Sequence, residues 1–249
     1  AERQPYQQIF LAFNALSTNE MLFDSFLRST LASCTDEDLL NNLEMWLLSY
    51  NLTFANIPES TVSRINGGIN LIGQQRWDEA LTVFNTITRQ ANTIAPPWFY
   101  MGLILYEKEQ TFAADAKFDL ALEIYPQYIA PRLFKFRILY DQQDYEKLLT
   151  KTDEAIEQND IWMFHYWKAK ALYALGEYNA AIREIEENCL EMNSWNSDEY
   201  FLLGDAYAAI SKFNLAEQAY AKTQEINPHS MDSRYNEKMQ LLQEARKGE

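Results

Sequence analysis

Side chains that commonly carry out catalysis or bind metals are scarce and widely separated in this sequence. The chain has two histidines, His165 and His229, and two cysteines, Cys34 and Cys189. Zinc sites and paired-histidine motifs need several such ligands at short spacing, which this set does not supply within one chain. The cysteines also lack the number and spacing of a disulfide framework. We therefore expect no metal site, no cofactor and two buried free thiols.

Motifs of the common enzyme classes are missing as well. With 7 glycines in all, the sequence has no glycine-rich phosphate loop, and it contains no Gly-x-Ser-x-Gly, Cys-x-x-Cys or protein-kinase motif. His165 lies in the aromatic stretch WMFHYW, where packing or contact with a partner is the simpler interpretation. The neighbouring carboxylates Glu184 and Glu187 are interpreted as solvated helix faces. The sequence thus predicts no catalytic residue and a protein that is not an enzyme.

Aromatic and cationic residues recur at helical spacing instead, and these could bind another molecule. Three consecutive segments each place three residues at i, i+4 and i+7, on one face of a helix. Tyrosine ends every triplet, and a cation stands in the middle of the second and third. Tyrosine combines apolar area with a hydroxyl group, and a cation among rings can hold a carboxylate or stack on a ring. The nine residues are Phe99, Leu103, Tyr106, Leu133, Arg137, Tyr140, Tyr166, Lys170 and Tyr173.

The elements that must position these residues are amphipathic helices joined in pairs. Residues 96–126 read PPWFYMGLILYEKEQTFAADAKFDLALEIYP. Two stripes at i, i+4 and i+7 predict two helices: Trp98, Gly102 and Leu105, then Ala114, Phe118 and Ala121. Pro126 ends the pair, because proline cannot continue a helix. One such hairpin cannot bury both stripes alone, so copies of it are expected along the chain.

The hairpin recurs at a period of about 34 residues. Its strongest copy places Tyr200, Leu203, Gly204, Tyr207, Ala216, Tyr220 and Pro228 at the positions of Trp98, Met101, Gly102, Leu105, Ala114, Phe118 and Pro126. Fainter copies precede and follow the opening one, and the weakest carries Phe136 where a small residue is expected. The five units cover residues 61–94, 95–128, 129–161, 162–196 and 197–230.

This pattern of a bulky residue, Leu-Gly, Tyr, Ala, Phe, Ala and Pro resembles the tetratricopeptide repeat (TPR) family. The resemblance covers about two thirds of the chain, from residue 61 to 230. It implies an all-α fold: a right-handed α-solenoid of helical hairpins, whose first helices line a concave face. In the family that face holds an extended or helical peptide, so the nine residues above are expected to line a partner-binding groove. The alternative is that they only pack repeat against repeat, or are covered by the chain's own N-terminal helices.

Small residues are expected where the two helices of a hairpin cross. Gly102, Ala169 and Gly204 on the first helices would let the second helices approach closely. Alanines on the facing helices are their expected counterparts, at positions 80, 114, 181 and 216. The sequence therefore predicts that small residues meet at each crossing and that bulky residues fill the space around it.

Residues on either side of the repeats differ from them. Residues 1–60 are expected to form an N-terminal helical cap or bundle, with helix starts at Ser17 and Thr35. Residues 231–249 are expected to contain a capping helix whose apolar stripe is Tyr235, Met239 and Leu242. The stretch ESTVSRINGGIN is faintly similar to the end of a DNA-recognition helix. DNA binding is rejected, because residues 1–60 contain no lysine and two arginines.

Composition sets further limits on the partner. The 249 residues include 21 Lys and Arg against 36 Asp and Glu, a formal net charge of -15, which would repel nucleic acid and anionic lipid. No apolar run is long enough for a membrane span, and no signal-peptide pattern opens the chain. We expect a soluble chain without direct membrane insertion, whose localisation the sequence leaves unknown: cytoplasmic and periplasmic sites both stay open.

The expected function is a non-enzymatic protein–protein interaction module, an adaptor or scaffold that binds a peptide or protein segment. Two alternatives stay open: a chaperone-like holder of a single secreted or assembly subunit, and a regulator of an enzyme. The partner is expected to carry apolar or aromatic residues and an acidic side chain. It is not the type held by a chaperone carboxylate clamp, because Ile65 and Ile69 occupy the positions of that clamp.

Overall fold

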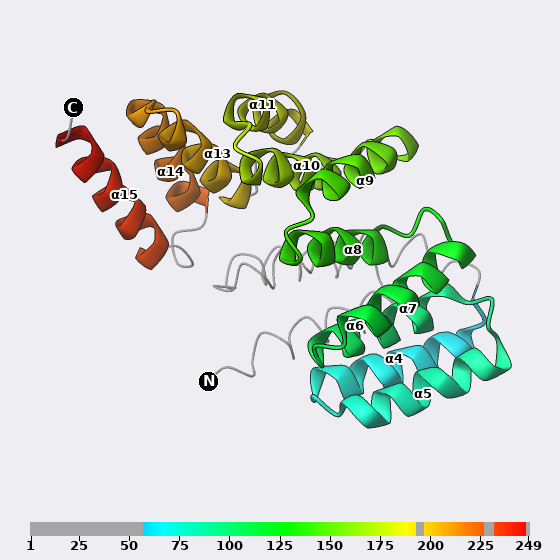
Figure 1. Ribbon diagram of the computed structural model, residues 1–249. Coiled ribbons are helices and arrows are strands. Elements are labelled where there is room, and N and C mark those ends of the chain that lie inside the picture. Colours follow the sequence, from blue (N-terminus) through cyan, green and yellow to red (C-terminus); the bar gives the residue numbers. More distant parts are fainter. Residues whose placement is uncertain (1–56, 193–196, 227–231, 248–249) are drawn as a thin grey trace. The chain divides into compact units, whose positions relative to one another are not determined.

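The computed structural model describes residues 57–192, 197–226 and 232–247. Within these ranges the chain is a succession of helices with no strand (Figure 1). It divides into two compact units, which meet in the sequence between Lys135 and Phe136. The expected N-terminal cap, with its helix starts at Ser17 and Thr35, lies outside the described residues, as do Cys34 and His229.

The described part of the first unit contains two complete helical hairpins. They are formed by α4 (Glu59–Gly73) with α5 (Trp77–Gln90), and by α6 (Ala95–Glu107) with α7 (Thr111–Ile124). Helices α4 and α5 pack against each other, and so do α6 and α7. The boundary between the units falls inside the next helix, α8 (Ile129–Asp141).

The second unit continues the alternation of first and second helices. It contains α9 (Tyr145–Gln158), α10 (Trp162–Ala174) and α11 (Tyr178–Glu184), followed by a π-helical turn, η1 (Ile185–Cys189), and α12 (Leu190–Met192). Then come α13 (Ser197–Ala209), α14 (Phe213–Ile226) and α15 (Asp232–Lys247). Leu242 of α15 is buried in the hydrophobic core of this unit, and Tyr235 and Met239 pack against the same core. The three residues of the expected apolar stripe therefore face the core together.

Each hairpin turns through one residue in the left-handed backbone region. These residues have φ between 58° and 80° and lie just after the end of the first helix: Gln75, Glu109, Gln143, Gly176 and Ser211. One is a glycine, which adopts this conformation without the steric cost that other residues meet. The hairpins therefore share one type of turn.

Glycine on the first helix makes room for an aromatic ring on the second. A Cβ atom added to Gly102 would lie 2.5 Å from Cε1 of Phe118, and one added to Gly204 would lie 2.4 Å from Cε1 of Tyr220. Gly68 has the same relation to Phe84, at 2.5 Å from its Cζ. The prediction of a close crossing at these glycines is therefore correct. Its detail was wrong, because the groups nearest to each glycine are rings, not the alanines expected to face it.

The same two positions are occupied differently in the third and fourth repeats. The ring stands sixteen residues after the glycine, and in the weakest unit this spacing relates Phe136 to Thr152. Both of these side chains are buried. In the fourth unit the pair is Ala169 and Ile185, which are each 0% exposed. Large and small residues thus trade places in the third repeat, whereas the fourth keeps the small residue on its first helix and has an aliphatic side chain in place of the ring.

The π-turn accommodates an additional residue in the second helix of the fourth unit. The corresponding helices α5, α7, α9 and α14 each have 14 residues. The helical stretch that begins at Tyr178 and ends at Met192 is one residue longer, and η1 absorbs the excess as a single wide turn. Within the described residues, no helix combines the length and the apolar composition needed to cross a membrane.

Candidate functional site

Three of the nine predicted groove residues lie in the core. Phe99, Leu103 and Leu133 are 2%, 9% and 2% exposed. Phe99 shows why, because its ring stands 5.1–5.9 Å from the rings of Tyr100, Phe118, Tyr128 and Phe134. A side chain enclosed in this way stabilises its own unit and offers no surface to a partner. We therefore leave these three residues out of the candidate surface.

Tyr106 is the partly exposed member of the triplet in α6. Its ring packs edge-on against Phe134 at 5.6 Å, so part of it also belongs to the core of the first unit. The other five predicted residues lie in the second unit, on α8 and α10. All five keep exposed or partly exposed side chains: Arg137, Tyr140, Tyr166, Lys170 and Tyr173.

The ammonium group of Lys170 lies among three aromatic rings. Its Nζ atom is 4.2 Å from the ring centroid of Trp167, 4.5 Å from that of Tyr140 and 5.6 Å from that of Tyr166. Each distance is within the range of a cation–π interaction. We call these four residues the Lys170 cluster. It joins the end of α8 to the middle of α10 and holds a cation at a defined place on a half-buried aromatic surface.

Tyrosines at the ends of α8 and α10 support this surface from the hairpin turns. Tyr140 packs against Tyr145, and Tyr173 packs against Tyr178, each pair with ring centroids 5.4 Å apart. Burial raises the pKa of Tyr140, and the nearby Tyr145 adds to the effect. Burial also raises the pKa of Tyr173. Both hydroxyl groups therefore stay protonated at neutral pH, where each can donate a hydrogen bond.

Sequence reasoning missed Trp167, which makes the shortest ring contact with Lys170. Its ring also stacks edge-on against Tyr140, with centroids 6.0 Å apart. The signal was present, because Trp167 precedes Lys170 by three residues, and residues at that spacing are neighbours on a helix surface. It was overlooked because Trp167 falls outside the i, i+4, i+7 stripe.

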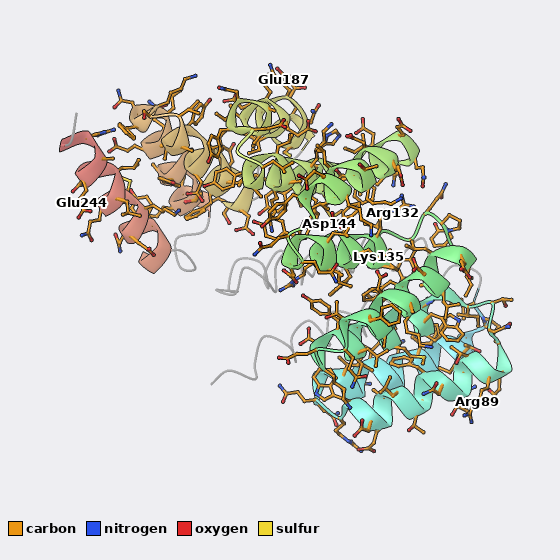
Figure 2. All side chains as sticks on the ribbon, in the orientation of Figure 1. Arg89, Arg132, Lys135, Asp144, Glu187 and Glu244 are labelled. Carbon is orange, nitrogen blue, oxygen red and sulfur yellow. The ribbon has the colours of Figure 1, made fainter. Side chains whose placement is uncertain are left out.

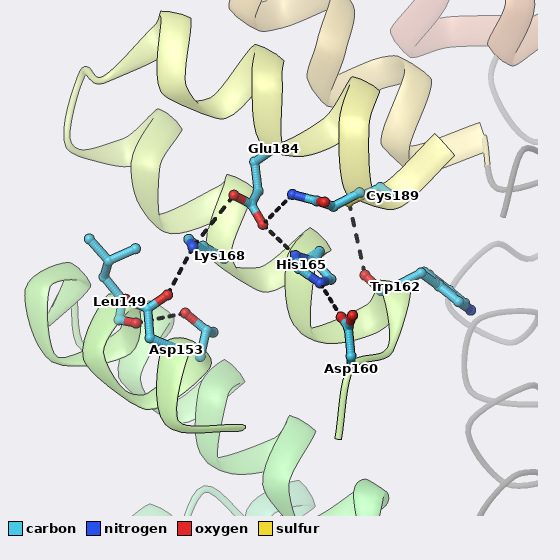
Figure 3. Close-up of polar contacts among 10 residues, drawn as sticks. Leu149, Asp153, Asp160, Trp162, His165, Lys168, Glu184 and Cys189 are labelled. Atoms are coloured by element: carbon cyan, nitrogen blue, oxygen red, sulfur yellow. Dashed lines mark hydrogen bonds and ion pairs between the residues drawn. The ribbon is translucent and has the colours of Figure 1, made fainter. Parts of the chain in front are cut away.

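A buried polar network lies on another face of α10 (Figure 3). His165 is 6% exposed, its Nδ1 contacts Oε1 of Glu184, and its Nε2 is 2.6 Å from Oδ1 of Asp160. Lys168 Nζ lies 2.9 Å from Asp153 and 3.5 Å from Glu184. These side chains come from α9, from α10, from the segment between them and from the end of α11. The network therefore ties three helical segments of the second unit together.

The protonation of His165 argues against a catalytic role. Burial alone would lower its pKa, but the hydrogen bonds to Glu184 and Asp160 outweigh burial and raise it. Both ring nitrogens face carboxylates, and both can donate only when the ring is protonated. A protonated ring has no lone pair with which to act as a base, and this one is almost closed to solvent. The geometry of His165 is that of an ion-pair partner of Glu184 and Asp160, whereas the sequence had favoured packing or contact with a partner for this residue.

The expectation for the carboxylate pair was wrong for one member. Glu184 is 9% exposed and belongs to the network, where burial would raise its pKa but the His165 hydrogen bond and Lys168 lower it. Glu187 is exposed and points outward from η1 (Figure 2). The two carboxylates do not face each other. Glu184 lies on the face of α11 that packs against α10, and its partners there could not be identified from the sequence.

Cys189 lies at the end of the π-turn and is a buried free thiol, as predicted. Burial raises its pKa, and the nearby Glu199 and Glu184 add to the effect. The thiol is therefore protonated and unreactive at neutral pH, because the thiolate is the nucleophile. In the described ranges, no three His, Cys, Asp or Glu side chains are grouped in a way that could hold a metal ion.

Comparison with proteins of known structure identifies the fold. No family model and no curated protein matches the sequence. Solved structures do match, among them TTC0263, a thermophilic TPR protein of Thermus thermophilus, at 18% identity and a TM-score of 0.58, covering 72% of this chain and 98% of that one. YrrB, described as a TPR protein with an unusual peptide-binding site, matches at 18% identity and a TM-score of 0.53, covering 80% and 98%.

A third match comes from a larger assembly. The APC/C hetero-tetramer Cut9–Hcn1 matches at 15% identity with a TM-score of 0.65, covering 93% of this chain and 44% of the other. At such identities the likeness establishes the fold. The chain has the all-α solenoid fold of TPR proteins, built from the helical hairpins that its repeats predict.

Proposed function

We propose that this chain is a non-enzymatic protein-interaction module that holds a segment of a partner protein on its second unit. The binding surface consists of the Lys170 cluster with Arg137 and Tyr173. The observation that carries the proposal is the position of the Lys170 ammonium group, 4.2–5.6 Å from three ring centroids. Like the TPR proteins that it resembles in fold, the chain would act through contacts with other proteins.

The chemistry of this surface defines the segment that it would bind. Partly exposed rings accept apolar or aromatic side chains at low entropic cost, because they are already held in place by neighbouring rings. The lysine has three N–H donors, and Arg137 is a second, exposed cation one helix away. An acidic residue flanked by apolar ones would complement both the charge and the rings of this surface. With a net charge of -15, the rest of the chain repels acidic partners, so the attraction must be local.

Capture followed by affinity measurement tests this proposal. The full chain is immobilised, retained proteins are identified by mass spectrometry, and each candidate is purified for measurement of its Kd. Lys170→Glu should weaken binding at least about tenfold, as expected for a central charged contact. Lys151→Glu is the matched control, because it makes the same charge change on α9 at a lysine paired with Glu154. The control should change Kd less than about twofold, as expected for a charge outside the contact.

A structural role for the Lys170 cluster predicts a different result. Lys170→Glu would then lower the melting temperature while the folded protein keeps its affinity. That outcome would refute the proposal. Stoichiometry separates the possible roles of a confirmed binder, since a holder should saturate with one partner and an adaptor should bridge two.

A further inference from the structure

Phe112 is the most exposed large apolar side chain in the described part of the chain. It is 92% exposed, against 50% for Leu241 and 38% for Leu215. Single apolar residues on a surface are ordinary, so the exposure of Phe112 gains meaning only from its position in the repeat and from its surroundings. It lies in the first turn of α7, directly after the hairpin turn of the second repeat.

The other repeats carry polar residues at this position. Counting from the start of each second helix, the equivalents of Phe112 are Asp78, Glu146, Asn179 and Asn214. The position needs no apolar group for folding, because four hairpins of the same fold have none there. Phe112 therefore has no structural role that the repeats share. Because its side chain is 92% exposed, its own hairpin does not cover it.

The backbone beneath Phe112 is held firmly. Glu109 takes the left-handed conformation at φ 60°, and Gln110 N donates to Leu105 O at 2.9 Å across the turn. Lys108 bridges to Asp78 of the preceding hairpin at 2.8 Å. Because the backbone here is already ordered, a partner that encloses Phe112 would have to restrict only the side chain itself. This is the usual character of an interface anchor.

The charges around Phe112 are mainly negative. Glu107 and Glu109 are exposed in the turn. Asp115 follows Phe112 by three residues on α7 and shares Lys135 with Asp119, two carboxylates to one ammonium group. The cation of Lys108 is already paired with Asp78. A partner that encloses Phe112 must therefore tolerate or complement a negative rim.

We propose that Phe112 is an anchor for a second partner, a protein segment with an apolar pocket or cluster flanked by lysine or arginine. This site lies on the first unit and does not depend on the surface proposed above, which favours an acidic segment. A second copy of this chain is the wrong occupant, because its net charge of -15 would oppose the negative rim.

A peptide library displayed on phage provides the probe. Peptides are selected on the full chain and counter-selected on Phe112→Asn, which carries the residue found in the fourth and fifth repeats. Because the side chain is 92% exposed, this variant should keep the wild-type melting temperature. Surviving peptides are synthesised, and their Kd is measured by fluorescence anisotropy on wild-type, Phe112→Asn, Glu109→Gln and Lys170→Glu proteins.

The proposal expects peptides with aromatic or aliphatic residues flanked by basic ones. Their affinity should fall about tenfold or more with Phe112→Asn, fall about threefold with Glu109→Gln and be unchanged by Lys170→Glu. It is overturned if no peptide survives counter-selection, if the survivors are acidic or neutral, or if their binding depends on Lys170 and not on Phe112.

Discussion

The packing at the helix crossings can be tested by transferring the residue pair of one repeat into another repeat. In the second repeat Gly102 faces the ring of Phe118, whereas the fourth repeat uses Ala169 and Ile185. Gly102→Ala places a Cβ 2.5 Å from ring carbon Cε1, where ordinary contact begins near 3.4 Å. The ring or the helix must then move by about 0.9 Å. Overpacking of this kind costs about 1–3 kcal/mol.

The higher helix propensity of alanine offsets part of the strain caused by Gly102→Ala, so a control substitution is needed. Alanine is favoured over glycine in a helix interior by about 1 kcal/mol, which hides part of the strain. Gly67→Ala is the matched control, because Gly67 lies inside α4 and a Cβ there meets nothing within 4 Å. Gly67→Ala should stabilise the chain by about 1 kcal/mol. The difference between the two substitutions isolates the strain of about 1–3 kcal/mol.

Phe118→Ile should relieve that strain when it accompanies Gly102→Ala. Alone, it removes ring volume from a side chain that is 0% exposed and should cost about 1–2 kcal/mol through the cavity. Together, the two changes recreate the Ala–Ile pair of the fourth repeat. The double variant should therefore be more stable than the sum of the single effects predicts, with a coupling of about 1 kcal/mol or more.

Urea unfolding followed by circular dichroism gives the four free energies of this cycle. Hydrogen exchange of the α6 and α7 amides checks that the change is local to this hairpin. Two results would refute the reasoning. One is additivity of Gly102→Ala and Phe118→Ile within about 0.5 kcal/mol. The other is a gain in stability from Gly102→Ala equal to that from Gly67→Ala.

Three further predictions concern the second unit. Because the pKa of His165 is raised in the folded chain, its contribution to stability is complete below about pH 6.5 and is lost as the pH rises through that raised pKa. Because the pKa of Glu184 is lowered, its contribution is present above about pH 4.5 and is lost as the pH falls through the lowered pKa. His165→Gln should therefore cost most between these values, and the difference from wild type should shrink once the pH exceeds the raised pKa of His165. A loss independent of pH in urea titrations would contradict the network. Gly176→Ala should cost about 1 kcal/mol, because Gly176 has φ 80°, and thermal unfolding unchanged from wild type would contradict this. Cys189 should resist alkylation by iodoacetamide at about pH 8 in the folded chain and react once it is unfolded in urea; rapid labelling of the native protein, located by peptide mapping, would show that the thiol is accessible.

The repeat pattern could be predicted from the sequence because it depends on local spacing. Stripes at i, i+4 and i+7, ended by a residue such as Pro126, define helices of fixed length, and the recurrence of Gly102 at Gly204 fixes their phase. Short connections then force successive helices into hairpins. The fold class follows from information carried within about 34 residues, which the chain supplies several times over, and the proposed repeat boundaries rest on the same spacing.

The candidate surface was only partly predictable, because exposure depends on what neighbouring helices cover. Phe99 and Tyr166 occupy equivalent sequence positions, yet the ring of Phe99 is 2% exposed while that of Tyr166 is partly exposed. The difference arises from the following hairpin, since Tyr128 and Phe134 pack against Phe99. A helical stripe states which residues share a face, but it does not state how much of that face the rest of the chain encloses.

The buried network of the fourth repeat was decided by tertiary structure alone. Glu184 is the last residue of α11, and its carboxylate contacts His165 and Lys168 of α10. Nothing in the local sequence distinguishes Glu184 from its exposed neighbour Glu187. A charged side chain is retained in the interior only where its partners are already in place, because an unpaired buried charge costs several kcal/mol. Those partners come from α9, α10 and the segment between them, and only the packed hairpins bring them to one point.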